Sequence, residues 1–219
     1  MGNLGDRLRQ RIRAQGPLRF DVFQEAALYD PDGGYYERPG RVGRQGDFVT
    51  GASWDPAFGR CVARAAKRLR DEWRGVEPVD VVDVGAGEGE LLADVDAALR
   101  AWDLRDGFRL TGVERSERRR ETARERCPTA AWLSSIEELP GLRGLVIAYE
   151  LFDALPVRAL FFDGERLLER GVTLGPGGEG FAWDVAECAD GAVLLERFRR
   201  RGIHLRSRRY RAWQNRDGE

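Results

Sequence analysis

Hydrophobic and polar positions in the middle of the chain follow two alternating periods, which predict strands and helices in turn. The β-branched run VDVVDV after Pro78 predicts a strand, and helical spacing returns over residues 90–101. The alternation continues with a strand at 109–114, a helix over 116–126, a short strand near 129–133 and the apolar run GLVIAY at 144–149. Because strands that alternate with helices form βαβ units, we expect an α/β fold with a Rossmann-like, doubly wound parallel sheet.

The residues before this sheet predict mainly helices. One short helix runs to about Arg13, and a second begins at a capping-box arrangement of Asp21 and Gln24. A long Gly- and Arg-rich loop from Tyr35 to Thr50 then precedes a helix over roughly residues 56–74. A loop of this length in a compact domain is more often functional than idle.

Beyond Pro156 the pattern becomes antiparallel. The run RALFFDGERLLERGVTL contains the pair Asp163-Gly164, a two-residue hairpin signal, and the extended piece GFAWDV and a final helix near 190–201 follow it. We therefore expect three parts: an N-terminal helical segment with the long loop (1–75), a Rossmann-like core (76–156), and a hairpin excursion with an arginine-rich C-terminal segment (157–219).

Composition narrows the class of protein. The 219 residues are 42% hydrophobic and 33% charged, and no run approaches the roughly 18 apolar residues of a membrane span. The first residues lack the apolar core of a secretory signal, so we expect a cytoplasmic protein with no membrane partner. Three scattered cysteines and the single His204 leave almost nothing from which to build a metal site. The net charge of −1 argues against a protein that binds nucleic acid over its whole surface.

A glycine cluster after the VDVVDV strand points to a cofactor. It reads Asp83-Val84-Gly85-Ala86-Gly87-Glu88-Gly89, whereas a dinucleotide fingerprint needs its third glycine one residue later, where Glu90 stands. The D-x-G-x-G-x-G spacing is that of methyltransferases, so we expect S-adenosyl-L-methionine as the cofactor. Its binding residues would be Asp83, Gly85, Ala86, Gly87 and Gly89, with Asp83 accepting from the cofactor's ammonium. A purely structural strand-to-helix turn is the alternative.

An acid at the end of the next strand strengthens this prediction. Glu114 closes the run LTGVE, and a carboxylate at that position can accept from both hydroxyls of an adenosine ribose. By itself Glu114 could equally be a solvated charge at a strand end. Together with a correctly spaced glycine loop, it favours a cofactor site.

Several blocks also resemble one known family. VVDVGAGEGELLADV, GVERSERRRE and VIAYELFDALPV are similar to motifs of the MidA-like methyltransferases, and GPLRFDVFQEAALYDPDGGYY and GRQGDFVTGASWDPAFG resemble that family's opening. The similarity runs from about residue 16 to about residue 160. The family includes a mitochondrial complex I assembly factor that methylates arginine, so the resemblance implies a methyltransferase whose substrate is an arginine of a protein.

The resemblance also implies further site residues. Asp47 and Thr50 would be polar contacts of a loop that closes over the cofactor, and Glu150 and Asp153 would face the methyl acceptor. Glu150, Asp153 and Asp47 are thus the catalytic candidates. The position agrees with general expectation, because ligands of open parallel sheets bind outside the carboxyl ends of the strands. The alternatives are that Asp47 only shapes a turn and that the other two acids only favour a helix N-terminus.

The chain departs from the family at two points. Tyr149 stands where the family has an asparagine, and the family's later strand, which completes the sheet, has no counterpart here. We therefore expect an incomplete sheet whose GLVIAY edge is covered by the chain's own hairpin, pairs with a second copy in a homodimer, or leaves the fold marginally stable.

Two other functions compete with methyl transfer. A shortened, inactive paralogue or a gene fragment would bind the cofactor or a protein partner without catalysis. An RNA-associated protein is suggested by eight arginines between Arg197 and Arg211 with Tyr210 and Trp213 among them, although a solvated helix end explains these residues as well.

Overall fold

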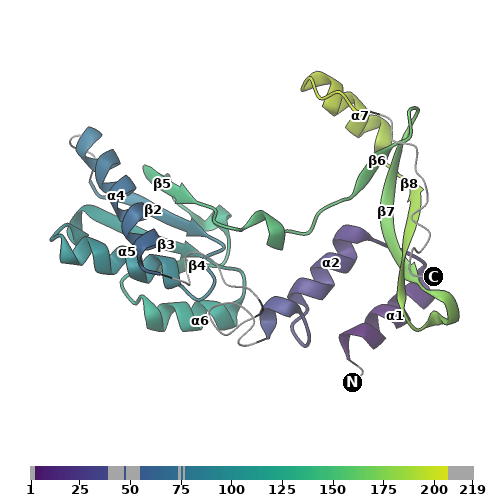
Figure 1. Ribbon diagram of the computed structural model, residues 1–219, viewed down its shortest axis with the longest axis horizontal. Coiled ribbons are helices and arrows are strands. Elements are labelled where there is room, and N and C mark those ends of the chain that lie inside the picture. Colours follow the sequence, from purple (N-terminus) through teal and green to yellow (C-terminus); the bar gives the residue numbers. More distant parts are fainter. Residues whose placement is uncertain (1–2, 39–46, 48–54, 74, 76, 207–219) are drawn as a thin grey trace. The chain divides into compact units, whose positions relative to one another are not determined.

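The computed structural model describes residues 3–38, 47, 55–73, 75 and 77–206, and these form two compact units (Figure 1). One unit, here called the core unit, spans Pro31–Leu155. The other, the hairpin unit, joins the described residues up to Asp30 to those from Pro156 onward. The first helices thus belong to the same unit as the C-terminal hairpin, whereas the sequence had placed them in separate segments, 1–75 and 157–219.

A four-stranded parallel sheet forms the centre of the core unit. Its order is β4-β3-β2-β5, and the strands are β2 (Val79–Val84), β3 (Phe108–Val113), β4 (Ala131–Leu133) and β5 (Gly144–Ile147). β2 pairs along its whole length with β3, from Val79↔Phe108 to Val84↔Val113. Every strand lies within a residue or two of its predicted range, which confirms the α/β fold with a parallel sheet.

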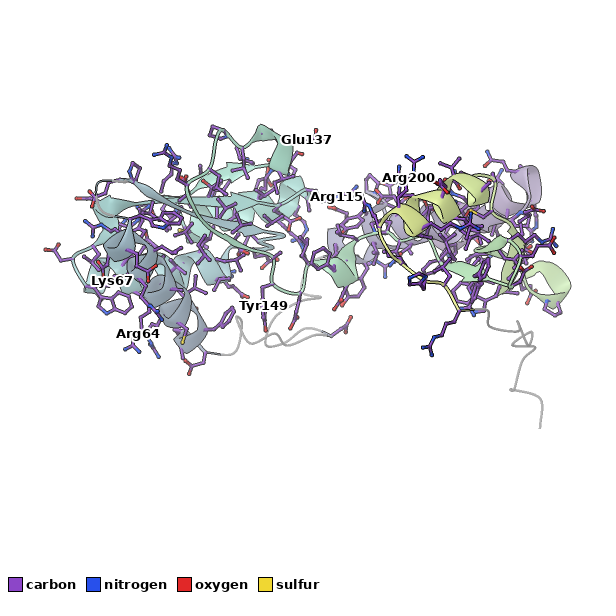
Figure 2. All side chains as sticks on the ribbon, turned by 90° about the horizontal axis from the view of Figure 1, so that it is seen from above. Arg64, Lys67, Arg115, Glu137, Tyr149 and Arg200 are labelled. Atoms are coloured by element: carbon purple, nitrogen blue, oxygen red, sulfur yellow. The ribbon has the colours of Figure 1, made fainter. Side chains whose placement is uncertain are left out.

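Three helices flank this sheet in sequence: α4 (Ala57–Glu72), α5 (Glu90–Ala101) and α6 (Glu117–Arg126). The apolar faces of α4 and α5 bury a cluster against β2 and β3 in which Ala63, Ala66, Leu92, Val95 and Leu99 are completely covered. Arg64 and Lys67 lie on the outer side of α4 (Figure 2). Burial of this apolar stripe fixes the helices on the sheet. None of the helices in the described ranges is long and apolar enough to cross a membrane.

The hairpin unit is built on the long strand β7 (Leu167–Leu174). β6 (Leu160–Phe162), β8 (Phe181–Glu187) and the two-residue β1 (Leu18–Arg19) all pair with it in antiparallel fashion. The helices of this unit are α1 (Leu4–Gln15), α2 (Phe20–Tyr29) and α7 (Gly191–Arg200). Leu8 and Ile12 of α1 pack with Leu18 and Val172, which gives the unit its own small core.

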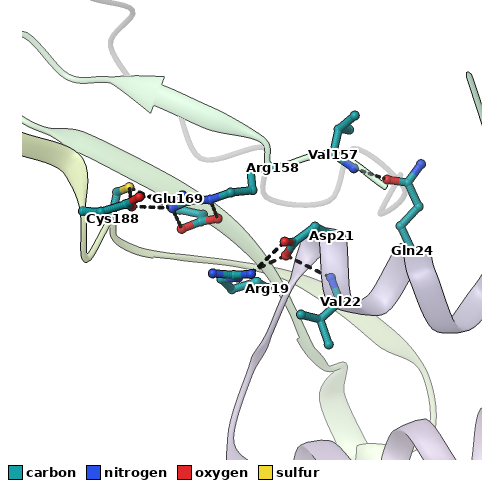
Figure 3. Close-up of polar contacts among 9 residues, drawn as sticks. Arg19, Asp21, Val22, Gln24, Val157, Arg158, Glu169 and Cys188 are labelled. Atoms are coloured by element: carbon teal, nitrogen blue, oxygen red, sulfur yellow. Dashed lines mark hydrogen bonds and ion pairs between the residues drawn. The ribbon is translucent and has the colours of Figure 1, made fainter. Parts of the chain in front are cut away.

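An ion-pair cluster holds the hairpin unit together (Figure 3). Arg158 donates through Nε and Nη2 to the two carboxylate oxygens of Glu169 on β7, each at 2.6 Å, and through Nη2 to Asp190 beside α7 at 2.7 Å. The Cys188 thiol lies 3.2 Å from the same Nη2. Because Glu169 is buried, its charge depends on this guanidinium for compensation.

Two local predictions in the hairpin unit are wrong. Asp21 and Gln24 do not form a capping box, since α2 begins one residue before Asp21; Asp21 instead accepts from Arg19, and Gln24 accepts from the Val157 amide at 2.9 Å (Figure 3). The β6–β7 turn has four residues, Asp163 to Arg166, rather than two, and the Asp163 carboxylate accepts from the amides of the last two.

One edge of the core sheet is formed by β5. β5 pairs with β2 from Asp80↔Gly144 to Asp83↔Ile147, and within the described part of the chain no strand pairs with its other edge. The hairpin pairs with β1 in its own sheet instead. Val146 on this edge strand is 45% exposed. The structure therefore shows no strand paired with this edge among the described residues, and the three alternatives given for the edge stay predictions.

Candidate functional site

The glycine loop joins β2 to α5 through a backbone path that few other residues adopt. Gly85, Gly87 and Gly89 have φ angles of +79°, +58° and +81°. The amides of Gly85 and the buried Ala86 donate to the Val113 carbonyl of β3 at 2.8 and 3.1 Å. Because a Cβ disfavours positive φ, the spacing of these glycines sets the shape of the loop.

Space around the three glycines differs. A Cβ at Gly85 would lie 2.7 Å from Leu151 Cδ1, and a Cβ at Gly89 would lie 2.9 Å from the Trp132 ring. At Gly87 the nearest atom would be Nη1 of Arg119, at 3.8 Å. The outer glycines thus allow close packing of the loop after β5 and of β4, whereas the middle glycine presents its backbone to open space that a ligand can fill.

Asp83 is the last carboxylate of β2 before the loop, and its side chain is only 4% exposed. Burial, together with the nearby negative charge of Glu114, raises the pKa of Asp83 to about 7. The raised pKa means that the surroundings of Asp83 stabilise its ionised form poorly. A ligand ammonium beside the carboxylate would stabilise that form.

Glu114 follows β3 and is 7% exposed. Its Oε2 accepts from the Gly87 amide at 3.0 Å and its Oε1 from the Ser116 amide at 2.9 Å. The carboxylate is thereby fixed between the glycine loop and the start of α6, and each oxygen retains a lone pair for a hydroxyl. The structure places Glu114 directly beside the glycine loop, as the sequence predicted.

A short 3-10 helix, η1 (Tyr35–Glu37), packs against the first turn of α6. Glu37 accepts from the Ser116 hydroxyl at 2.9 Å, and the Arg119 guanidinium lies over the Tyr36 ring, 4.9 Å from its centroid. The sequence reasoning did not single out Tyr36, Glu37 or Arg119. The adjacent tyrosines after Gly33-Gly34 could have drawn attention to Tyr36. Arg119 is one of several arginines on α6, and nothing in the sequence distinguishes it from the others.

The two loop residues expected over the cofactor have different outcomes. Asp47 accepts a hydrogen bond from the Tyr35 hydroxyl at 3.2 Å, and the Tyr35 and Tyr36 rings meet edge to face, so Asp47 is linked to η1. Thr50 lies outside the described residues.

The acids expected at the acceptor side lie in the loop after β5. Glu150 and Asp153 are both exposed, and Asp153 belongs to the 3-10 helix η4 (Phe152–Ala154). Glu150 has a φ of +50°, an unfavourable angle for a residue with a Cβ, and such strain is often found at functional sites. Burial raises the pKa of Tyr36, the nearby positive charge of Arg119 opposes this shift, and the negative charges of Asp153 and Glu114 add to it.

Tyr149, which replaces the family's asparagine, packs against α4. Its ring lies 4.7 Å from the Phe58 ring, with an angle of 43° between the planes. Figure 2 shows its side chain at the end of β5. The added bulk is thus used in an aromatic contact at the start of the loop that carries Glu150.

Comparisons with known proteins show the family to which the chain belongs. A family model described as "Putative S-adenosyl-L-methionine-dependent methyltransferase" matches residues 61–216. The mitochondrial protein arginine methyltransferase NDUFAF7 homolog of Drosophila melanogaster is 30% identical over 186 residues, which are 73% of this chain and 42% of that protein. The NDUFAF7 protein of Danio rerio is 26% identical over 185 residues, with 68% and 42% covered.

A solved structure also resembles the chain. The crystal structure of a Burkholderia thailandensis protein bound to S-adenosyl-homocysteine superposes with a TM-score of 0.71 at 30% identity, covering 88% of this chain and 52% of that one. This likeness confirms the α/β fold with a parallel and an antiparallel sheet. The chain spans about two fifths of the length of the curated relatives, 42%, and about half of the solved one, 52%. The chain belongs to the family of S-adenosylmethionine-dependent methyltransferases that this model describes, the MidA-like family that its motifs resemble.

Proposed function

We propose that this chain binds S-adenosylmethionine at the carboxyl end of the core sheet and transfers its methyl group to an arginine of a protein substrate. The observation that carries the proposal is the Glu114 carboxylate, buried and fixed by the Gly87 and Ser116 amides beside three glycines of positive φ. The solved relative with bound S-adenosyl-homocysteine supports the same ligand class.

The residues present fit this cofactor. Glu114 would accept from the ribose hydroxyls, and Asp83 would accept from the ammonium. The space beside Gly87 would let the ligand approach the backbone of the loop. When bound, the cofactor supplies a methyl group on a positively charged sulfur. The protein's part is alignment, which can contribute roughly 7–11 kcal/mol to the lowering of a barrier.

The loop after β5 is the part that we assign to the methyl acceptor. Glu150 and Asp153 are exposed carboxylates beside Leu151, whose side chain packs on Gly85. A guanidinium is a planar fork of donors that two carboxylates can orient. These acids would hold the acceptor arginine and keep one of its nitrogens directed at the cofactor. The NDUFAF7 relatives are named protein arginine methyltransferases, which supports this substrate class.

Cofactor binding without transfer is the second candidate. It is favoured by the edge strand β5, on which Val146 is 45% exposed. Transfer of isotope-labelled methyl from S-adenosylmethionine to arginine-rich proteins, followed by hydrolysis and detection of methylarginine, decides between the two. Labelled methylarginine supports the enzyme, and tight binding without any labelled product supports the second candidate.

Calorimetric titration with S-adenosyl-homocysteine tests the shared first step. Loss of a hydrogen bond to a charged group costs roughly 1.5–3 kcal/mol, so Glu114→Ala should weaken binding about ten- to hundredfold. Glu121→Ala, on the exposed side of α6, is the matched control and should bind like the unaltered chain. Equal affinities of all three proteins would remove Glu114 from the site.

A further inference from the structure

Arg119 is a buried cation beside the glycine loop that the site described above does not use. It lies in the first turn of α6 and is 7% exposed. Its Nε is buried and has no hydrogen-bond partner among the residues that the structure describes, and no carboxylate there forms an ion pair with it. A buried charge without a partner is costly, so a group with this environment calls for a ligand.

The guanidinium is nevertheless held in place. One face lies over the Tyr36 ring at 4.9 Å, and η1 is itself tied to α6 through the bond from Ser116 to Glu37. Contact with an aromatic face orients the planar group but leaves its N–H bonds, which lie in the plane, free to donate. Arg119 is thus positioned before any ligand binds.

The direction in which it is held is toward the middle of the glycine loop. Its Nη1 is the nearest atom to the point where a Cβ at Gly87 would lie, at 3.8 Å, and the Gly87 amide donates to Glu114 at 3.0 Å. A donor and an acceptor therefore flank the same glycine. A sugar hydroxyl both donates and accepts, so a carboxylate and a guanidinium together complement a vicinal diol better than either does alone.

We propose that Arg119 is a second ribose-binding residue, an inference that rests on the proposed cofactor site. Arg119 donates to a hydroxyl oxygen of the adenosine half, while Glu114 accepts from the hydroxyls. Tyr36 is its positioning residue. Arg119 thus binds the nucleoside half of the cofactor and not its amino-acid carboxylate. A nucleoside ligand that lacks any carboxylate depends on Arg119 as strongly as the whole cofactor does.

Calorimetric titration with two probes tests this assignment. S-adenosyl-homocysteine carries both halves, and 5′-methylthioadenosine carries the adenosine half alone. Arg119→Met, which keeps the length and packing of the stem, should weaken both probes by the same factor of about ten or more. Arg124→Met is the matched control, since Arg124 on α6 only forms an exposed ion pair with Glu117, and it should leave both affinities unchanged.

Two further variants separate a ligand contact from a structural one. Arg119→Lys keeps the positive charge but loses the planar, forked set of donors. It should fold and lose less affinity than Arg119→Met, and it replaces Arg119→Met in the test if that variant fails to fold. Tyr36→Leu should weaken both probes, and Tyr36→Phe, which keeps the ring, should restore binding.

Each other outcome is decisive. A loss confined to S-adenosyl-homocysteine would assign Arg119 to the carboxylate and overturn the proposal, and so would unchanged binding of both probes to a folded Arg119 variant. If the unaltered chain binds neither probe, the proposed function fails and this inference fails with it. Binding by the unaltered chain that is insensitive to Arg119 would leave the proposed function standing alone.

Discussion

The buried carboxylate of Asp83 makes cofactor binding depend on pH. Burial raises its pKa to about 7, so the carboxyl is about half protonated at neutral pH in the free protein. A ligand ammonium beside it requires the ionised form. The ionised fraction rises from about one tenth at pH 6 to about nine tenths at pH 8, so affinity for S-adenosyl-homocysteine should increase roughly tenfold over this range.

The stability of the free protein should change in the opposite direction. Since folding raises the pKa of Asp83 from 3.8 to about 7, the folded state favours the protonated form. The stability due to this group is fully present below pH 3.8 and is lost as the pH rises through 7. Each unit of difference between the folded and unfolded pKa of Asp83 is worth about 1.4 kcal/mol, so the free energy of unfolding falls by about 4 kcal/mol over this pH range. Asp83→Asn should remove this loss and make the free protein more stable at pH 8.

Calorimetry at pH 7 in two buffers of different ionisation enthalpy measures the proton directly. We expect release of about half a proton when S-adenosyl-homocysteine binds. 5′-Methylthioadenosine has no ammonium and is the control that should release none. Asp83→Asn should bind S-adenosyl-homocysteine weakly and with little pH dependence. A pH-independent affinity of the unaltered chain with no proton release would refute the assignment of Asp83 to the ammonium.

The remaining predictions concern strain, the ion-pair cluster and the open sheet edge. Glu150→Gly should relieve the positive φ and stabilise the chain to urea by about 1 kcal/mol while methyl transfer falls; lower stability would show that the loop is held by the Glu150 side chain. Arg158→Ala strands the buried charge of Glu169 and should cost about 3 kcal/mol in urea unfolding, against under about 1 kcal/mol for the exposed Arg166→Ala; equal losses would contradict the cluster's role. With Val146 exposed, light scattering should detect dimers through β5, or its outward amides should exchange rapidly; a stable monomer with strongly protected β5 amides would mean that this edge is covered.

The cofactor end of the site could be predicted because its chemistry is local in sequence. The spacing of Gly85, Gly87 and Gly89 sets a backbone path within one turn, and Glu114 follows a strand that the alternation of strands and helices predicts. Parallel pairing of β2 with β3 then brings Asp83 and Glu114 to the same sheet edge. Each step depends on neighbours along the chain or on a single pairing rule.

The rest depended on contacts between distant segments. The pairing of β1 with β7, which places α1 and α2 in the same unit as the hairpin, has no local signal in two residues of strand. Gln24 resembled part of a capping box but bonds to Val157, more than a hundred residues away. Arg119 likewise became distinct from its neighbours only when Tyr36 lay against it. Tertiary partners override such local patterns.

A crystal structure of this chain with S-adenosyl-homocysteine tests the central claim most directly. The account predicts density for the ligand at the carboxyl end of β2 and β3, with the ribose hydroxyls within hydrogen-bond distance of the Glu114 carboxylate and the ammonium beside Asp83. Ligand bound elsewhere on the core sheet, or bound here with its ribose directed away from Glu114, would contradict it.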